Sequence, residues 1–338
     1  MNIRQLAKNL KLSKSAVSYA LKNDPRIAKA TIARVQTAAK KYSYKPEPTV
    51  SRVMSAIARK NTGNVTAPIV LLSDWPTAQH WRNTQDSLDR FYRGLVSQAQ
   101  KRGYCIEELW MRSPGMHPKR IDQILAARGT QGVIVFNYAS APATLEVDLS
   151  PYASAVWGRA LVRPRIFAVD HDHHQGLFEC LHQIKAQGYQ RPALILHTDA
   201  HERTMHCWAA AYQFFIAQLP KNQQIPLWLI GPNDQARFRK WMKHYKPDAI
   251  ISSHFVVLDY IASAGYSVPD DVGFAALFWR NKSHNVAGID TRDEAQAAQT
   301  VDLVIEQIRT NTHGLPLYPE TVLFDGVWRE GPSLPLRQ

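Results

Sequence analysis

The chain has 338 residues, of which 45% are hydrophobic and 20% charged, and its formal net charge at pH 7 is +13. This length exceeds one ordinary hydrophobic core, so we expect two or three domains, and the composition is that of a globular rather than a disordered protein. No run of eighteen apolar residues occurs, which argues against a membrane span.

The N-terminus and the cysteines indicate the cellular compartment. The opening residues Met-Asn-Ile-Arg lead into no apolar stretch, so no secretory signal is expected. Cys105, Cys180 and Cys207 are scattered and odd in number, which favours free thiols in a reducing environment over a disulfide framework. We therefore expect a cytoplasmic protein.

Almost all of the positive charge lies in the first sixty residues. They carry 14 Lys or Arg and two acidic residues, a net charge of +12, whereas the remaining 278 residues carry 27 basic and 26 acidic side chains. This asymmetry predicts a polyanionic partner for the N-terminal segment and a nearly neutral body behind it. A solvated basic face without a function is the alternative.

Three short amphipathic helices are predicted within this basic segment. Ile3, Leu6, Ala7 and Leu10 have the i, i+3, i+4, i+7 spacing of a helix over residues 3–10. A second helix over 13–21 can be capped by the hydroxyl of Ser13, and a third runs from about residue 28 to residue 42. Closely joined helices around one small core follow the helix-turn-helix plan, whose second helix fits the major groove of DNA.

Several strings in this segment follow one family pattern. They are residues 3–7 (Ile-Arg-Gln-Leu-Ala), 12–13 (Leu-Ser), 16–23 (Ala-Val-Ser-Tyr-Ala-Leu-Lys-Asn), 31, 34–35 and 42–46 (Tyr-Ser-Tyr-Lys-Pro). Together they resemble the headpiece of LacI/GalR-type transcriptional regulators. The resemblance implies that Lys14, Ser15 and Tyr19 read base edges, whereas Ser18 and Asn23 touch phosphates. A lysine can donate to guanine, and a tyrosine ring can contact a thymine methyl group; solvated side chains are the alternative.

The segment after the headpiece predicts a connector followed by a short helix. Residues 45–48 (Lys-Pro-Glu-Pro) favour an extended conformation, and apolar residues then return at helical spacing over 50–57. In the family, this stretch is a hinge helix that pairs across a dimer on DNA and inserts an apolar wedge into the minor groove. The sequence fits the family string only if Pro48 is an added residue, which makes Met54 the wedge candidate and Val53 the second. A linker helix that packs on the body is the alternative.

From residue 67 onward the pattern alternates between strands and helices. Strands are predicted at 69–72, 105–110, 132–136, 165–169, 193–196, 227–230, 249–252 and 273–278, and helices at 85–102, 118–128, 175–187, 203–218, 234–245 and 256–264. Such alternation specifies parallel sheets covered by helices on both faces. Two such runs in tandem resemble the two-lobed, periplasmic-binding-protein-like core of LacI-type regulators, with local matches at 169–176, 265–272, 287–290 and 326–333.

The predicted fold is therefore multidomain, with an all-α helix-turn-helix headpiece before a two-lobed α/β core. We expect the headpiece at 1–45, the hinge helix and linker at 46–64, and an effector-binding and dimerisation domain at 65–338. Within that domain, the N-lobe is expected at about 65–170 and 290–318. The C-lobe is expected at about 190–288 and 319–338.

A ligand of such a core would bind in the cleft that the carboxyl ends of the strands face. The candidates are therefore residues that follow predicted strands: Ser73, Asp74, Trp75, Asn137, Tyr138, Asp170 and His197. The family also places an arginine on the next helix, where this chain has Arg203. Where the family usually has an acidic pair, this chain has Phe278 and Trp279, so an aromatic platform is expected to replace a carboxylate that binds hydroxyl groups.

No motif predicts catalysis or a bound metal or cofactor. Residues 171–174 (His-Asp-His-His) could suggest a metal site, but adjacent residues on a turn rarely converge on one ion, so a loop is favoured. No glycine-rich phosphate loop, nucleophile elbow or paired catalytic constellation occurs. Trp75, Trp81 and Trp110 are expected to pack in the core or cleft.

These observations predict a DNA-binding transcriptional regulator, in the repressor mode, rather than an enzyme. A homodimer would read a pseudo-palindromic operator in double-stranded DNA, under the control of a small-molecule effector such as a sugar or related metabolite. The alternative is a solute-binding or enzymatic two-lobed protein with an incidental basic arm.

Overall fold

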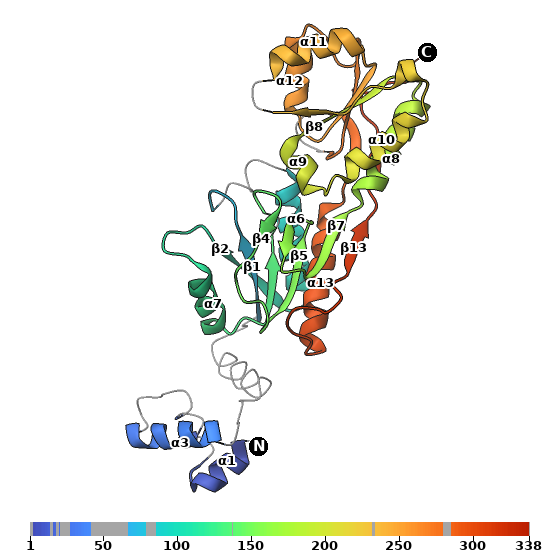
Figure 1. Cartoon of the computed structure of the whole chain (residues 1–338). Helices are drawn as coiled ribbons and strands as arrows, with labels where there is room; N and C mark the ends of the chain where they lie inside the picture. Colours follow the sequence, from blue (N-terminus) through green and yellow to red (C-terminus); the bar gives the residue numbers. More distant parts are fainter. Residues whose placement is uncertain are drawn as a thin grey trace. The chain divides into compact units, whose positions relative to one another are not determined.

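The computed structural model describes residues 3–13, 16–17, 20, 28–41, 67–78, 86–136, 138–231, 234–279 and 285–337. The chain forms two compact units, Met1–Val65 and Thr66–Gln338 (Figure 1). No helix in these described stretches is long and apolar enough to cross a membrane.

The first unit contains α1 (Ile3–Leu10) and α3 (Lys29–Lys41). Helix α1 ends in a Schellman motif, in which the amides of Lys11 and Leu12 donate to the carbonyls of Lys8 and Ala7 at 3.2 and 3.0 Å. Lys11 takes the left-handed conformation that this motif requires, with φ of 51°. The turn is therefore closed by the backbone itself, which fixes the angle at which the chain leaves α1.

The second predicted helix begins as expected at Ser13. The hydroxyl of Ser13 accepts a hydrogen bond from the amide of Ala16 at 3.1 Å, and residues 16, 17 and 20 are helical. The predicted helix over 3–10 is confirmed, and the third helix covers 29–41 of the expected 28–42. The small core of this unit consists of Leu6, Ala7, Val17, Ala20, Val35 and Ala39.

The second unit contains two parallel-stranded lobes. The sheet of the first lobe has the order β13-β7-β5-β3-β1-β2, and its pairs are parallel. Its strands are β1 (Ala67–Ser73), β2 (Tyr104–Trp110), β3 (Gly132–Val135), β5 (Ala153–Trp157), β7 (Phe167–His171) and β13 (Thr321–Phe324). Helices α6 (Asp86–Lys101) and α13 (Asp293–Arg309) cover one face, and α7 (Pro118–Ala127) covers the other. A small ladder joins β4 (Ala143–Thr144) to β6 (Leu161–Arg163).

The sheet of the second lobe has the order β14-β12-β11-β10-β8-β9. Its strands are β8 (Pro192–His197), β9 (Trp228–Ile230), β10 (Ala249–Ser252), β11 (Gly273–Ala276), β12 (Ala287–Asp290) and the antiparallel β14 (Val327–Arg329). One face packs on α8 (His173–Ala186) and α10 (Cys207–Ala217), and the other on α11 (Gln235–Tyr245) and α12 (Val256–Ser263). The short α9 (Thr198–Arg203) follows β8, and a 3-10 turn spans Lys221–Gln223.

The chain passes between the lobes after β7, between β12 and α13, and between β13 and β14. We expected residues 319–338 in the C-lobe, but β13 pairs with β7 of the first sheet, so this crossing lies after Phe324. The helix α8 packs in the core of the second lobe. Only two residues separate β13 from β14, so the sequence did not indicate that the chain moves from one sheet to the other there.

Two further expectations were wrong in detail. Residues 153–157 (Ala-Ser-Ala-Val-Trp) form the buried β5, which was missed because small residues have low strand propensity, although pairing with β3 and β7 buries it. The expected helix over 203–218 is two helices, because Met205 and His206 have positive φ values of 50° and 61° and break it.

Candidate functional site

The described helices of the headpiece are held together around one small core. Arg34 donates to the carbonyl of Leu10 at 3.1 Å, which ties α3 to the end of α1. The residues expected to contact DNA (Lys14, Ser15, Ser18, Tyr19, Asn23 and Met54) lie outside the described residues, as does the expected hinge over 46–64. Their contacts with DNA stay predictions.

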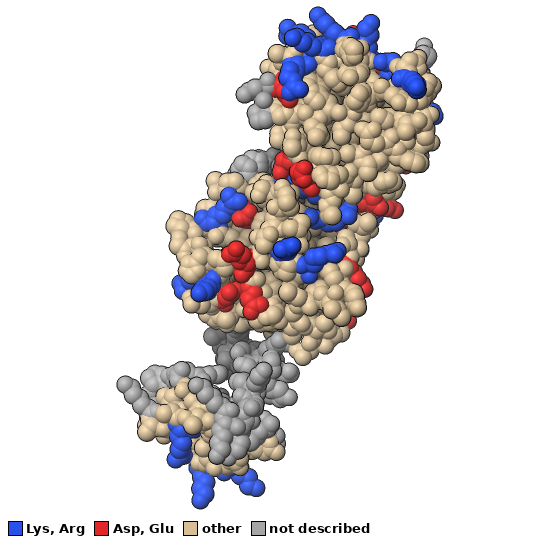
Figure 2. Space-filling model, viewed as in Figure 1, with Lys and Arg blue, Asp and Glu red and all other residues tan. Residues whose placement is uncertain are grey.

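A second basic cluster lies on the second lobe of the second unit. Figure 2 shows Lys and Arg gathered over the end of the second lobe that carries α11. The exposed residues of this cluster on α11 are Arg237, Arg239, Lys240 and Lys243. Arg237 is paired with Asp234 at 2.9 Å, and Arg239 donates to the carbonyl of Ser263. This cluster provides an internal comparison for the charge of the headpiece.

A cavity of about 200 Å³ lies between the two lobes of the second unit. Its lining comes from both sheets, near the carboxyl ends of parallel strands, where α/β proteins bind small molecules. The lining residues are Trp75, Ser87, Leu88, Ala139, Trp157, Gly158, Arg159, Asp170, His171, His173, Asp199, Ala200, Arg203, Thr204, Trp208, Ser253, His254, Phe278, Thr291, Asp293 and Gln296.

Four of the nine predicted effector residues line this cavity: Trp75, Asp170, Arg203 and Phe278. The other five predicted residues do not. Ser73 is buried at the end of β1, and Asp74 is bound by Arg112 at 2.9 Å. A tenth candidate, Asn137, follows β3 and lies outside the described residues.

The remaining three predicted residues have other contacts. Tyr138 packs in the core beside α7, and burial raises the pKa of its phenol. His197 caps α9 by accepting from the amide of Asp199 at 3.3 Å. The ring of Trp279 lies under the guanidinium of Arg329, 5.6 Å away, instead of facing the cavity.

Aromatic rings form the apolar walls of the cavity. Trp208 is 1% exposed and meets Phe278 edge to face, with 5.3 Å between ring centroids. Trp157 is held from behind by Phe91, which stacks on it at 3.8 Å. The ring nitrogen of Trp157 donates to Gln296 at 2.8 Å. These walls offer flat apolar surfaces to one face of a ligand.

Three polar side chains contact one another in the wall of the cavity. Arg159 Nε donates to Asp170 Oδ2 at 3.0 Å, and His173 Nε2 lies 3.4 Å from Asp170 Oδ1. Burial alone would raise the pKa of Asp170, but the interactions with His173 and Arg159 outweigh it and lower that pKa. Burial and the neighbouring His173 lower the pKa of His171 to about 4, and this ring contacts the carbonyl of Phe324 at 3.0 Å. Each charge is thus compensated within the protein.

Arg203 connects the lobes across the cavity. Its guanidinium donates to the backbone carbonyls of Tyr138 and Ala139 in the first lobe, the latter at 2.8 Å. It also contacts Asp199 of its own helix at 3.1 Å. Arg203 therefore links the end of α9 to the loop after β3 and fixes the relative position of the two walls.

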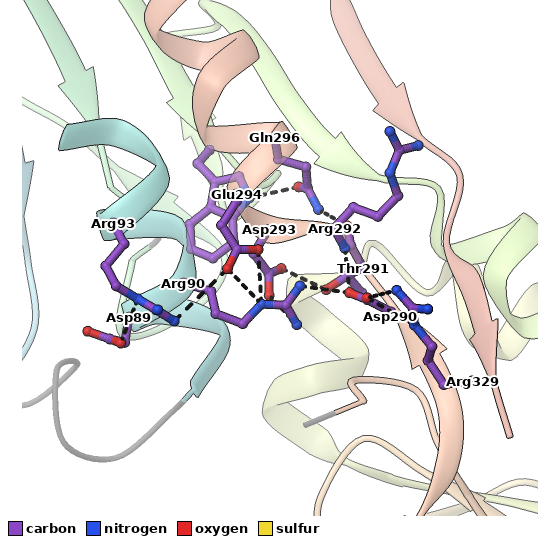
Figure 3. A network of polar contacts seen from close by, with 11 residues as sticks. Asp89, Arg90, Arg93, Asp290, Thr291, Arg292, Asp293, Glu294, Gln296 and Arg329 are labelled. Carbon is purple, nitrogen blue, oxygen red and sulfur yellow. Dashed lines mark hydrogen bonds and ion pairs between the residues drawn. The ribbon is translucent and has the colours of Figure 1, made fainter. Parts of the chain in front are cut away.

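A second link between the lobes lies beside the crossover into α13 (Figure 3). Asp290, at the end of β12, accepts from Arg90 of α6 at 2.8 Å and from Arg329 of β14 at 2.9 Å. Burial would raise the pKa of Asp290, but the hydrogen bonds from Arg90, the amide of Arg292 and Arg329 lower it. Arg90 also contacts Glu294 at 3.0 Å. One buried carboxylate thus joins elements of both lobes.

The sequence did not single out several cavity residues. Arg159 follows strand β5, which was missed. Asp293 begins α13, a helix that was not among the predicted helices, although the match at 287–290 just before it was noted. His173 was considered only within the run at 171–174. In the structure that run diverges: Asp172 caps α8, whereas His171 and His173 face the cavity. Over the described residues, no group of three His, Cys, Asp or Glu could hold a metal ion.

Several solved structures with a similar architecture are described as transcriptional regulators. No family model and no curated protein matches the sequence. The transcriptional regulator CelR in complex with cellobiose aligns with a TM-score of 0.58 at 15% identity, over 98% of this chain and 99% of that one. The Lac repressor dimer bound to operator and the anti-inducer ONPF aligns at 0.57 and 12% identity, over 99% of each chain.

A third match covers a smaller share of the chain. A LacI family transcriptional regulator from Enterococcus faecium with bound ribose aligns with a TM-score of 0.54 at 14% identity, over 80% of this chain and 100% of that one. The predicted fold class is confirmed by these matches together with the observed sheets. The chain therefore has the fold of the LacI-type transcriptional regulators over nearly its whole length.

Proposed function

We propose that this protein is a DNA-binding transcriptional regulator of LacI type whose affinity for an operator is controlled by a small-molecule effector. The observation that carries the proposal is the combination of a basic helix-turn-helix unit with a two-lobed unit that holds an interlobe cavity. A protein that only bound a solute would not need a basic helix-turn-helix unit. Together they fit a device in which a ligand controls DNA binding.

The distribution of charge supports the headpiece as the DNA-binding part. A net charge of +12 on residues 1–60 is enough to neutralise several phosphates, which makes affinity strongly dependent on salt. Sequence is read by base contacts, for which we propose Lys14, Ser15 and Tyr19, while Ser18 and Asn23 contact phosphates. Met54 is proposed as the residue that enters the minor groove.

Control by the effector follows from the links between the lobes. A ligand between the walls changes the balance of contacts made by Arg203 and Asp290, and the chain crosses between the lobes nearby. A coupling of about 1–3 kcal/mol is typical of such regulation. We further propose a cytoplasmic homodimer, so that two headpieces read the two halves of a pseudo-palindromic operator. The effector is proposed to be a sugar or a related metabolite.

An enzymatic role has one observation in its favour. Ser253 Oγ lies 2.9 Å from His254 Nδ1 in the wall of the cavity, as a nucleophile and its base would. However, the carboxylates that line the same cavity have other partners: Asp170 contacts His173, Asp199 contacts Arg203 and Asp293 accepts from Thr291. We therefore propose that the protein is not an enzyme, and failure of phenylmethylsulfonyl fluoride to label Ser253 would agree with that proposal.

The test of the proposed function uses the full-length protein and fragments of upstream DNA from its own genome. We expect a selective complex in gel shifts that weakens steeply with salt. Replacing Lys14 and Tyr19 together by Ala is expected to weaken it by about a hundredfold, since each base contact is worth about 1–3 kcal/mol.

The matched control replaces Lys240 and Lys243 of α11 by Ala, which removes charge outside the headpiece. This control is expected to keep both affinity and selectivity. The proposal would be refuted by the absence of any selective complex, or by equal losses in the headpiece variant and the α11 variant.

A further inference from the structure

Three buried polar atoms on residues lining the cavity have no hydrogen-bond partner within the described part of the chain: Asp293 Oδ2, His173 Nδ1 and Trp208 Nε1. Asp293 begins α13, whereas His173 and Trp208 lie on α8 and α10 of the second lobe. Their exposed fractions are 2%, 5% and 1%. Because buried polar atoms are nearly always paired, three such atoms around one cavity indicate a ligand that pairs with them.

The carboxyl group of Asp293 is the most informative of the three. Its Oδ1 accepts from the hydroxyl of Thr291 at 2.6 Å, while Oδ2 lies 3.7 Å from Arg90 Nη1, beyond hydrogen-bond distance. Arg90 instead donates to Asp290 and Glu294, as Figure 3 shows. Among the residues that the structure describes, no cation therefore donates a hydrogen bond to Asp293.

The surroundings of Asp293 favour its neutral form. Burial raises the pKa of this carboxyl to about 7; the Thr291 hydroxyl and Arg90 oppose the rise, and the charges of Glu294 and Asp290 add to it. The other titratable groups lining the cavity are Arg159, Asp170, His171, His173, Asp199, Arg203 and His254. Arg159 and Arg203 already have partners in Asp170 and Asp199, so neither is available to neutralise an ionised Asp293.

We propose that Asp293 binds the effector as a neutral carboxylic acid, with Oδ2 donating a hydrogen bond to an oxygen of an uncharged ligand. Trp208 Nε1 donates to a second oxygen of the same ligand. His173 faces Asp170 through Nε2, and its Nδ1, which has no partner among the described residues, pairs with a hydroxyl group of the ligand. This inference rests on the proposed effector role of the cavity.

The same atoms exclude two other classes of ligand. An amine cation would need Asp293 to be ionised, and a phosphate or carboxylate would need an arginine that is not already paired. Hydroxyl and carbonyl oxygens match the donors at Asp293 and Trp208, and the aromatic walls accept the apolar face of a ring. The ligand class is therefore an uncharged polyhydroxyl or carbonyl compound.

The first arm of the test requires no effector. The spectrum of the Asp293→Asn variant is subtracted from that of the unmodified full-length protein. The difference should show the band of a protonated carboxyl at pH 6, and this band should disappear by pH 8. The matched control is Asp302→Asn, which removes a carboxylate from the same helix, outside the cavity. The control should retain the band. A spectrum without the band at pH 6 would overturn the proposal.

The second arm measures binding by calorimetry at pH 6 and pH 8. The uncharged probes are D-ribose, D-glucose and cellobiose, with glucosamine and glucose 6-phosphate as charged probes. We expect an uncharged probe to bind about tenfold more weakly at pH 8, because only the neutral fraction of Asp293 is competent. Asp293→Asn should remove this dependence, since its amide still donates, and Asp302→Asn should keep it.

The results separate this inference from the proposed function. Binding of charged probes alone, stronger binding at pH 8, or no binding by any probe would overturn the role of Asp293. Gel shifts with operator fragments are read independently. Selective DNA binding with affinity for the probe unchanged between the two pH values refutes only the role of Asp293. A tenfold pH dependence without DNA binding refutes only the regulator.

Discussion

Asp290→Asn removes the charge that joins the two lobes beside the crossover. The carboxylate is 7% exposed, and it accepts from Arg90, which is 11% exposed, and from Arg329, which is 48% exposed. An Asn keeps the shape but loses the charge assistance, which is worth roughly 1–2 kcal/mol for the buried Arg90 contact. The half-exposed Arg329 contact adds at most about 1 kcal/mol. Arg90 keeps Glu294, so the free energy of unfolding should fall by about 2 kcal/mol.

The assay for Asp290→Asn is thermal unfolding of the full chain at pH 7. For a unit of this size, about 2–4 °C of Tm corresponds to each kcal/mol, so Tm should fall by roughly 4–8 °C. The control is Asp302→Asn, whose partner Arg102 is 44% exposed and whose loss should shift Tm by less than about 3 °C. Equal shifts for the two variants would show that the buried carboxylate contributes no more than a surface ion pair, and the reasoning would fail.

Three further outcomes follow from the same contacts. Trp208→Phe keeps a ring in the wall but removes Nε1, so effector affinity measured by calorimetry should fall about tenfold while Tm changes by only a few degrees. Arg203→Met leaves the carbonyls of Tyr138 and Ala139 without their donor, and should lower Tm and weaken effector binding, whereas Arg237→Met, which affects only an exposed pair, should do neither. The folded-state pKa of Asp293, about 7, is above its unfolded value of 3.8, so its contribution to stability is complete below pH 4 and is lost as pH rises to about 7. The free energy of unfolding should be measured in urea at pH 4.5, 6 and 8 for the wild-type protein and for Asp293→Asn. Over this range the wild-type value should fall by up to about 4 kcal/mol relative to that of the variant, with no further fall above pH 8.

Much of the fold could be predicted because its signals are local. The i, i+3, i+4 spacing of α1 and the capping hydroxyl of Ser13 are set by neighbouring residues, and both are observed. Strands such as β1 and β10 are continuous apolar runs because both faces are buried. By contrast, β5 contains Ala-Ser-Ala, and only its pairing with β3 and β7 makes it a strand.

The candidate site was predicted only in part, because a cavity depends on side-chain direction as well as position. The positions of strand ends correctly predicted Trp75 and Asp170 as lining residues. Ser73, however, is buried outside the lining, and Asp74 forms an ion pair with Arg112. Phe278 and Trp279 are adjacent, yet only Phe278 faces the cavity. Asp293 was missed because nothing local distinguishes a carboxyl in the first turn of a helix from an ordinary exposed one.

The first turn of α13 physically connects the cavity to the crossover, because two carboxyls three residues apart share one arginine. Arg90 Nη2 is bonded to Asp290 at 2.8 Å, and Arg90 Nη1 lies 3.7 Å from Asp293. At that distance an ionised Asp293 would attract Arg90 by about 4 kcal/mol at an effective dielectric constant of 20, comparable with the contribution of Asp290. An effector that keeps Asp293 neutral therefore leaves Arg90 on Asp290, whereas ionisation of Asp293 makes the two carboxylates compete for Arg90. It follows that Asp290→Asn, which frees Arg90, should lower the midpoint of the Asp293 infrared titration below that of the unmodified protein. An unchanged midpoint would mean that the two carboxyls act independently, and that the cavity signals to the crossover by another route.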